Sequence, residues 1–233
     1  MLSFKKAFTP SYSQCGEDLI VEFVLKNNLK VKNINYLDIG TNHPVKFNNT
    51  YKFYQQGSTG VLVEPDYDLF TILKNKRPKD ITLNAGVDKK ERELDFYLLE
   101  PDTLNTFSIK EVEQYKKFYN AKVRNVVKVP TININNILKK YFNKTLDFLS
   151  IDVEGLDYAI VSSIDFDKIR PKVICVESMI YEKNNVLKKS KKIKNLLYSK
   201  GYFMYADTFV NSIYVDAILW KKMKQPKLLN MGN

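Results

Sequence analysis

Acidic residues stand at the ends of five successive predicted strands, and their side chains are well placed to do chemistry. Asp38, Glu64, Asp88, Asp152 and Glu177 each complete or follow one of these strands. In an open α/β sheet, ligands bind beyond the carboxyl ends of the strands, near the point where the strand order reverses. Five acids in that place exceed what a sheet needs for its own stability, so the sequence predicts a binding site there.

The loop after the first strand, DIGTNHP (38–44), indicates which ligand this site takes. It lacks the second and third glycines of G-x-G-x-x-G, the motif that lets a pyrophosphate approach a helix start. An acid at the end of the first strand would repel phosphate but would suit an ammonium group. Glu64 follows at about the interval expected for an acid that binds ribose from the next strand. A ribose, an adenine and a zwitterionic amino acid without phosphate describe S-adenosylmethionine, which is the predicted cofactor.

The predicted cofactor contacts come from the loops after the first three strands. Asp38 and Gly40 would bind the methionine part, and Glu64 would accept both ribose hydroxyls unless it is an ordinary loop acid. Two further loop residues and three residues placed to flank adenine complete this part of the set: Asn42, Asp66, Gly86, Val87 and Asp88.

Apolar runs that alternate with helix-period segments must position these residues. Strands are predicted at 34–39, 60–64, 81–87, 147–152, 172–177, 202–206 and 212–220, and helices at 16–28, 47–57, 66–76, 133–142 and 186–200. This alternation implies parallel strands with right-handed crossovers and helices on both faces. The connection between the last two strands is too short for a helix, so they should pair antiparallel. The predicted fold is an α/β Rossmann-like class I methyltransferase fold, with a seven-stranded, mainly parallel sheet and an antiparallel last strand.

Residues 94–130 do not fit the simple alternation of strands and helices. Two additional strands, ELDFYLL and RNVVKVP, flank the stretch TLNTFSIKEVEQYKKF. We interpret 94–130 as an insertion or lid between the third and fourth core strands, over the ligand crevice. The whole chain, 1–233, is expected to form a single methyltransferase domain, in which 1–33 is an N-terminal helical segment.

Composition narrows the class of protein. No segment approaches the roughly 18 apolar residues of a membrane helix, and the N-terminal stretch lacks the apolar centre of a secretory signal. The distant Cys15 and Cys175 favour a reduced, cytoplasmic location over a disulfide framework, and with one histidine they argue against structural zinc. The net charge of +11 suits either solvation or a phosphate-bearing partner, and leaves peripheral membrane contact open.

Several blocks of the sequence resemble FkbM-family methyltransferases in their order and spacing. They are YSQCGEDLI (12–20), residues 36–70, LNAGV (83–87), PDTLNTFS (101–108), DFLSIDVEGLDYAIV (147–161) and RPKVICVES (170–178). The resemblance implies a Rossmann-like fold, S-adenosylmethionine as methyl donor, and usually O-methylation of sugars or secondary metabolites. It also implies that Gln14 and Glu17 face the cofactor pocket; the alternative for Glu17 is a cap of the first helix.

A sugar hydroxyl is a poor acid, so a general base or a metal ion should assist its methylation. Histidine is a common general base, and His43 lies on the cofactor loop, although a lone histidine is more often structural. The other catalytic candidates are Asp152, Glu154 and Glu177, with a turn cap as the alternative for Glu154. If their strands are neighbours, Asp152 and Glu177 could share a proton, pair with a basic side chain, or bind Mg²⁺ or Mn²⁺.

The insertion supplies the candidate acceptor contacts. Thr103, Asn105 and Thr106 could donate hydrogen bonds to acceptor hydroxyls or merely shape a lid, and Arg124 could bind a phosphate or a sugar. The leading hypothesis is an O-methyltransferase acting on a carbohydrate, such as a nucleotide-activated sugar or glycan precursor in bacterial surface polysaccharide biosynthesis. The alternatives are an RNA methyltransferase, although no RNA-binding motif is recognised, and a noncatalytic anion-binding protein. The oligomeric state stays open, a homo-oligomer included.

Overall fold

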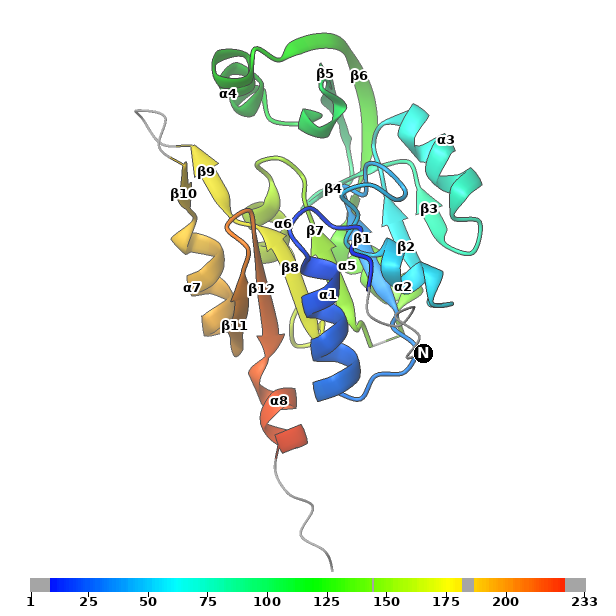
Figure 1. Cartoon of the computed structure of the whole chain (residues 1–233). Coiled ribbons are helices and arrows are strands. Elements are labelled where there is room, and N and C mark those ends of the chain that lie inside the picture. The colour runs from blue at the N-terminus through cyan, green and yellow to red at the C-terminus, as the bar shows by residue number, and fades with distance from the viewer. Residues whose placement is uncertain (1–8, 144, 182–186, 225–233) are drawn as a thin grey trace, which may run out of the picture.

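The computed structural model describes residues 9–143, 145–181 and 187–224. Residues 1–8 of the predicted N-terminal segment and residue 186 of the helix predicted at 186–200 lie outside the described residues. A central sheet lies between two layers of helices (Figure 1). Its strands are β1 (Tyr36–Ile39), β2 (Gly60–Val63), β3 (Ile81–Leu83), β7 (Phe148–Ile151), β8 (Val173–Glu177), β11 (Tyr202–Asp207) and β12 (Asn211–Asp216). The order is β11-β12-β8-β7-β1-β2-β3, and β12 runs antiparallel to both of its neighbours. The predicted class I methyltransferase sheet is thereby confirmed.

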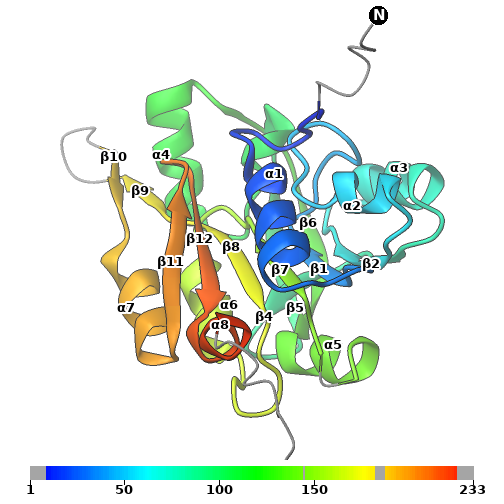
Figure 2. The same cartoon turned by 60° about the horizontal axis from the view of Figure 1, so that its bottom comes forward.

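The central strands are apolar on both faces because helices cover both. One face packs against α5 (Ile134–Tyr141), α6 (Asp157–Ser163) and α7 (Lys191–Ser199). The other packs against α1 (Glu17–Glu22), α2 (Tyr51–Gln55), α3 (Tyr67–Lys76) and α8 (Ala217–Lys224), and Figure 2 shows α1 and α8 on this side. Alternate residues of β1 enter the two clusters, with Leu37 and Ile39 on the α5 side and Tyr36 on the α1 side, as the period of a strand requires.

Some predicted elements have different boundaries or types. The strand expected to 220 ends at Asp216, whose Oδ1 accepts hydrogen bonds from the backbone of Ile218 and Leu219 and so starts α8. The apolar run that follows is helical, a distinction that a short apolar run cannot make by itself. The strand expected over 81–87 divides into β3 and β4 (Gly86–Asp88), and the first helix continues as a π-helical segment (Phe23–Asn28). Helix α6 and the hairpin of β9 (Met179–Tyr181) and β10 (Leu187–Lys189) were not predicted.

The segment between β3 and β7 contains a second small sheet. The strands of this sheet are β4, β5 (Glu93–Glu100) and β6 (Lys122–Asn133). A 3₁₀ turn (Asp102–Leu104) and α4 (Ile109–Tyr119) lie between β5 and β6 in the chain. β6 pairs antiparallel with β5 near its start and parallel with β4 near its end. This segment lies above the carboxyl ends of the strands of the main sheet (Figure 1). Its own apolar cluster packs α4 against β5. Within the described ranges, no helix is long and apolar enough to cross a membrane.

A fully buried arginine connects the elements around the start of β1. The Arg77 guanidinium donates hydrogen bonds to Asp80 (2.7 Å), Asn48 and Thr50 (3.1 Å each) and the Tyr36 hydroxyl (3.0 Å). Its partners belong to β1, to the start of α2 and to the loop after α3. The guanidinium charge is therefore desolvated but fully paired, which makes the loss of either partner costly.

Replacement of Arg77 by methionine should lower the free energy of unfolding by about 3–5 kcal/mol, because the buried Asp80 carboxylate loses its counter-charge. Urea unfolding measures this change. Lys76→Met is the matched control, since Lys76 is exposed on the same helix, and it should change stability by less than about 0.5 kcal/mol. Equal stabilities of the two variants would contradict a structural role for the Arg77 network.

Candidate active site

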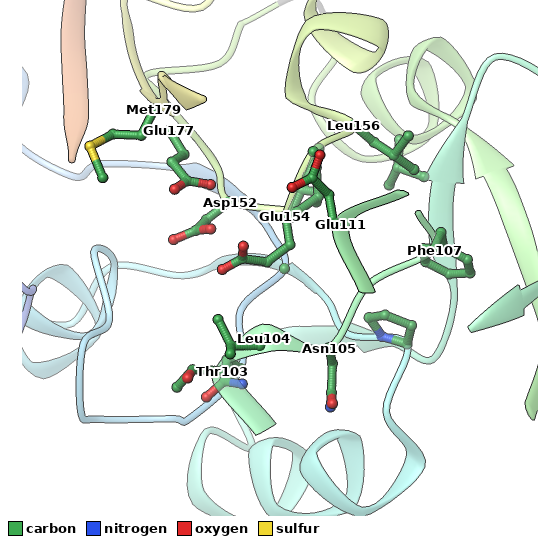
Figure 3. Close-up of a pocket in the computed structure, with 18 of the residues that line it drawn as sticks. Thr103, Leu104, Asn105, Phe107, Glu111, Asp152, Glu154, Leu156, Glu177 and Met179 are labelled. Carbon is green, nitrogen blue, oxygen red and sulfur yellow. The ribbon is translucent and has the colours of Figure 1, made fainter. Parts of the chain in front are cut away.

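A cavity of about 1210 Å³ opens at the carboxyl ends of β1, β2, β7 and β8. The insertion contributes its opposite wall, including Phe96, Thr103, Asn105, Phe107 and Tyr115. Figure 3 shows side chains of both walls directed into this space. A pocket for one drug-sized ligand typically has a volume of about 300–1,000 Å³. The cavity is therefore somewhat larger than a pocket for one such ligand.

The loop after β1 approaches the loop after β7 so closely that only glycine fits between them. Gly40 has a φ of +77°, and a Cβ there would lie 1.8 Å from the carbonyl oxygen of Asp152. The Gly40 N–H donates to Val63 (3.0 Å) and the Asp152 N–H donates to Ile39 (3.0 Å). These bonds hold three strand ends together and fix the backbone from which Asp152 projects.

Glu64, directly after β2, is a buried carboxylate held by backbone donors. Its oxygens accept hydrogen bonds from the N–H groups of Asn42 (2.7 Å) and Asp66 (2.9 Å), and it lines the cavity. Burial raises the pKa of Glu64 to about 8, although these hydrogen bonds oppose the shift. Each carboxylate oxygen has lone pairs to spare, so this group fits the hydroxyl pair of a ribose.

Three further carboxylates converge in the middle of the cavity. Asp152, Glu154 and Glu177 each offer an oxygen within 4.8 Å of the other two, and Figure 3 shows these groups facing one another. Burial, followed by the charge of Asp38, raises the pKa of Asp152 to about 6. Burial and the neighbouring acids also raise the pKa values of Glu154 and Glu177. Such a cluster can share protons or hold a hard divalent cation through oxygen ligands.

The insertion fixes the position of Glu154. The Tyr115 hydroxyl of α4 donates a hydrogen bond to the Glu154 carboxylate, and the Thr106 hydroxyl donates to its backbone carbonyl (2.8 Å). Glu154 has a φ of +51°, a conformation that only the surrounding contacts make favourable. On the other side of the loop, the Asp157 carboxylate accepts from the N–H groups of Val153 and Gly155.

The structure brings together most of the predicted site residues. The following line the cavity: Gln14, Gly40, Asn42, Glu64, Gly86, Val87, Thr103, Asn105, Asp152, Glu154 and Glu177. The prediction that Asp152 and Glu177 end neighbouring strands is confirmed, since β7 and β8 are paired. Their individual roles stay predictions.

His43 does not lie with the carboxylates, contrary to the expectation for a base at the acceptor. Its side chain is exposed and is not part of the cavity wall. Nδ1 accepts hydrogen bonds from the backbone of Val45 (3.1 Å) and Lys46 (2.9 Å). The ring therefore closes its own loop, and the lone pair that a base would need is already used there.

Asp38 and Glu17 are buried beneath the cavity and do not line it. Asp38 accepts a hydrogen bond from the Thr50 hydroxyl (2.7 Å), which itself accepts from Arg77, so its carboxylate is joined to the Arg77 network. Glu17 accepts from the Thr208 hydroxyl (2.6 Å) and from the Cys15 N–H (2.8 Å), and it thereby attaches α1 to the loop before β12. Glu17 is therefore a contact between α1 and the loop before β12, and α1 has no side-chain cap hydrogen bond of the kind expected as the alternative.

Four other predicted contacts also lie off the cavity wall. Asp66 caps α3 and accepts from the Asn105 amide, and Thr106 bonds to the Glu154 backbone. Asp88 forms an ion pair with Arg92 (2.9 Å). Arg124 is exposed and donates to the Leu99 carbonyl (3.0 Å). Each of these side chains is engaged locally, which a reading of strand ends and loop composition could not reveal.

Several cavity residues were not identified from the sequence. Tyr115 and Lys110 lie in α4, Tyr158 lies in α6, and Lys191 and Lys192 begin α7. The only signal for Tyr115 is its place on the buried side of an amphipathic helix, where it looks like an ordinary core residue. The lysines look like a solvated helix surface until the fold directs them toward the cavity.

Solved structures similar to this chain are methyltransferases of several kinds. A putative caffeoyl-CoA O-methyltransferase from Staphylococcus aureus is 13% identical, with a TM-score of 0.46 over 89% of this chain and 85% of that one. An O-methyltransferase from Bacillus cereus in complex with SAH is 12% identical (TM-score 0.41; 88% and 82% covered). A putative RNA methyltransferase from Pyrococcus horikoshii is 10% identical (TM-score 0.43; 92% and 91% covered).

The comparison with family models is decisive for the family. Curated proteins gave no sequence match. In contrast, the model described as the methyltransferase FkbM domain matches residues 38–204, from the middle of β1 into β11. The match includes the Gly40 turn, Glu64, the insertion and the carboxylate cluster. The chain therefore belongs to the FkbM methyltransferase family and is an S-adenosylmethionine-dependent methyltransferase.

Proposed function

We propose that this methyltransferase transfers the methyl group to a hydroxyl of a carbohydrate, with a nucleotide-activated sugar or a glycan precursor of bacterial surface polysaccharide as its acceptor. The observation that carries the proposal is the cluster of Asp152, Glu154 and Glu177 in the middle of the cavity. Such a cluster suits an acceptor whose proton must be removed. Free Cys15 and Cys175 support a cytoplasmic location.

The wall nearest β1 and β2 would hold the cofactor. Glu64 would accept the ribose hydroxyls, and Gly86 and Val87 would flank the adenine. Gly40 and Asn42, with Gln14 from the N-terminal side, would contact the methionine part. When bound there, S-adenosylmethionine supplies an already activated methyl group, so the protein has to position the acceptor and accept its proton. Near-attack alignment alone can contribute roughly 7–11 kcal/mol.

Asp152 is our candidate for the general base. It projects from the backbone that Gly40 fixes, and a carboxylate with a pKa of about 6 is a stronger base than an ordinary aspartate. Tyr115 would act as a positioning residue, since its hydroxyl orients Glu154 toward the other two acids. Asp152, Glu154 and Glu177 could also hold Mg²⁺ or Mn²⁺, which would supply charge stabilisation for the deprotonated hydroxyl.

The segment 94–130 serves, in this proposal, as a roof over the acceptor within a single methyltransferase domain. Its Thr103 and Asn105 line the cavity, and Asn105 bridges the Leu99 N–H (2.6 Å) and the Asp66 carboxylate (3.1 Å). Thr103 is exposed and would be the acceptor contact of the two.

Glu64→Gln should weaken binding of S-adenosylhomocysteine at least tenfold in titration calorimetry. The titration is carried out at pH 9, above the Glu64 pKa of about 8, where the carboxylate is charged. The amide can accept at only one of its two positions, and a hydrogen bond to a charged group contributes about 1.5–3 kcal/mol. Asp88→Asn is the matched control, because Asp88 is also an acid at the carboxyl end of a strand but does not line the cavity. Unchanged affinity in Glu64→Gln, or an equal loss in the control, would refute the ribose role.

The ligand-free protein should lose stability as the pH rises from about 4.5 to 8. Folding raises the Glu64 pKa from 4.5 to about 8, so the folded state retains a proton that the unfolded chain releases. The resulting contribution is complete below about pH 4.5 and is lost as the pH rises through about 8, with a size on the order of 5 kcal/mol. Urea unfolding at pH 5 and pH 8 measures it. Glu64→Gln does not titrate and should show a smaller difference; an unaltered difference would assign the effect to other groups.

The protein is incubated with S-adenosylmethionine and a panel of nucleotide sugars, neutral sugars and RNA, and the products are analysed by mass spectrometry. The mass of a sugar compound should increase by about 14 Da, the difference between a methyl group and the hydrogen that it replaces. Asp152→Asn should lower kcat at least a hundredfold, in the range typical of a lost general base, with S-adenosylhomocysteine affinity retained. Methylated RNA with inert sugars would reverse the proposal.

Chelation by EDTA tests whether a divalent cation is needed. Activity that is lost in EDTA and restored by Mg²⁺ supports the metal role, and full activity in EDTA rejects it.

A further inference from the structure

The cavity extends beyond the carboxylate cluster in a direction set by the order of the strands. Glu64 follows β2, Gly40 follows β1, Asp152 follows β7 and Glu177 ends β8, and these strands are consecutive neighbours in the sheet. Neighbouring strands are about 4.8 Å apart, so the proposed ribose acid and Glu177 are separated by three such spacings. The cofactor end and the far end of the cavity are therefore different subsites.

All four basic side chains in the described wall of the cavity belong to α4 or to the β10–α7 segment. They are Lys110, Lys189, Lys191 and Lys192. Figures 1 and 2 both show α4 beside β9 and β10, on the side of the sheet away from β2 and β3. Among the residues that line the cofactor end, Gly40, Asn42 and Glu64 included, none is basic. The basic residues of the cavity therefore lie at the end opposite the proposed cofactor site.

These four lysines differ in their partners. Lys189 is half-buried and forms an ion pair with Asp207 (2.7 Å), and its Nζ donates to Ser178 and Ser212. Lys110, Lys191 and Lys192 are exposed, and no carboxylate in the described part of the chain forms an ion pair with them. Lys189 is thus held by contacts within the fold, whereas the ammonium groups of the other three line the cavity without a direct ion pair among the described residues.

Aromatic rings accompany these charges. Tyr158 is 44% exposed and lines the cavity, with the Lys192 Nζ 5.9 Å from the centre of its ring. Tyr119, 48% exposed, lines the same cavity from α4. Exposed aromatic faces beside basic groups are the combination that binds a base or sugar ring next to its phosphate.

We propose that Lys110, Lys191 and Lys192 bind the phosphate groups of an anionic acceptor, with a nucleoside diphosphate as the class of group recognised. The assignment to the acceptor rests on the proposed function. The carboxylate cluster repels phosphate and tolerates a neutral hydroxyl, so the two charge signs orient the acceptor with its reacting hydroxyl at Asp152 and its phosphates at α7. Specificity for a phosphorylated over a neutral sugar follows from this arrangement.

Titration calorimetry with UDP, on protein saturated with S-adenosylhomocysteine, tests the subsite without any methyl transfer. The double variant Lys191→Ala, Lys192→Ala should raise the Kd for UDP at least tenfold. The control is Lys139→Ala, Lys194→Ala, which removes the same charge from exposed positions outside the cavity wall and should change this Kd less than twofold. Both double variants should bind S-adenosylhomocysteine as the unaltered protein does, which also shows that they are folded.

Absence of UDP binding to the unaltered protein would overturn the inference, as would equal weakening in both double variants, which is the signature of overall charge. A single-stranded RNA oligonucleotide that displaces UDP and binds more tightly would also overturn it in favour of a nucleic acid. Lysine-dependent UDP binding would stand even if no sugar were methylated. Methylation of a neutral sugar without UDP binding would support the proposed function and refute this subsite.

Discussion

The arrangement of the site depends on one close contact between backbones. Gly40 approaches the Asp152 carbonyl so closely that any side chain at position 40 would overlap it. This contact joins the ends of β1 and β7, the two central strands, and the hydrogen bond from Asp152 to Ile39 reinforces it. The cofactor loop and the proposed base therefore share one rigid backbone unit. In the proposed function, the backbone position of the base relative to the cofactor loop is therefore set by the sheet.

The sequence was sufficient for the main sheet and for part of the site. Continuous apolar runs such as GVLV and VICVE identify strands that are buried on both faces, and the lengths of the connections determine their directions. Glu64, Asp152 and Glu177 could be placed in one cavity because parallel strands bring their carboxyl ends to the same edge. These predictions need only the period of the pattern and the rules of crossover connections.

Within the candidate site, the differences from the expectations concern the direction of single side chains. Asp38 lies within β1 and faces the Arg77 network, which could be found only by knowing that Arg77 reaches it from the end of α3. His43 closes its own loop through Nδ1, a local bond that the spacing of residues does not reveal. Tyr115 and the lysines of α7 reach the cavity only because the insertion and the β9–β10 hairpin fold over it. The contacts of Tyr115 and of the α7 lysines are long-range, and a single sequence does not reveal them.

β6 is the middle strand of the second sheet, with β4 on one side and β5 on the other. Its last residues pair with β4 at the cavity wall, and its first residues pair with β5 in the insertion, so one continuous backbone runs from the core to the roof. The insertion is thus connected to the core through the pairing of β6 with β4 and through side-chain contacts such as that of Tyr115 with Glu154. If the proposed function holds, substitutions on α4 would change which acceptor is bound and leave the loops after β1 and β2 intact. New acceptor preferences would then evolve mainly through the sequence of the insertion.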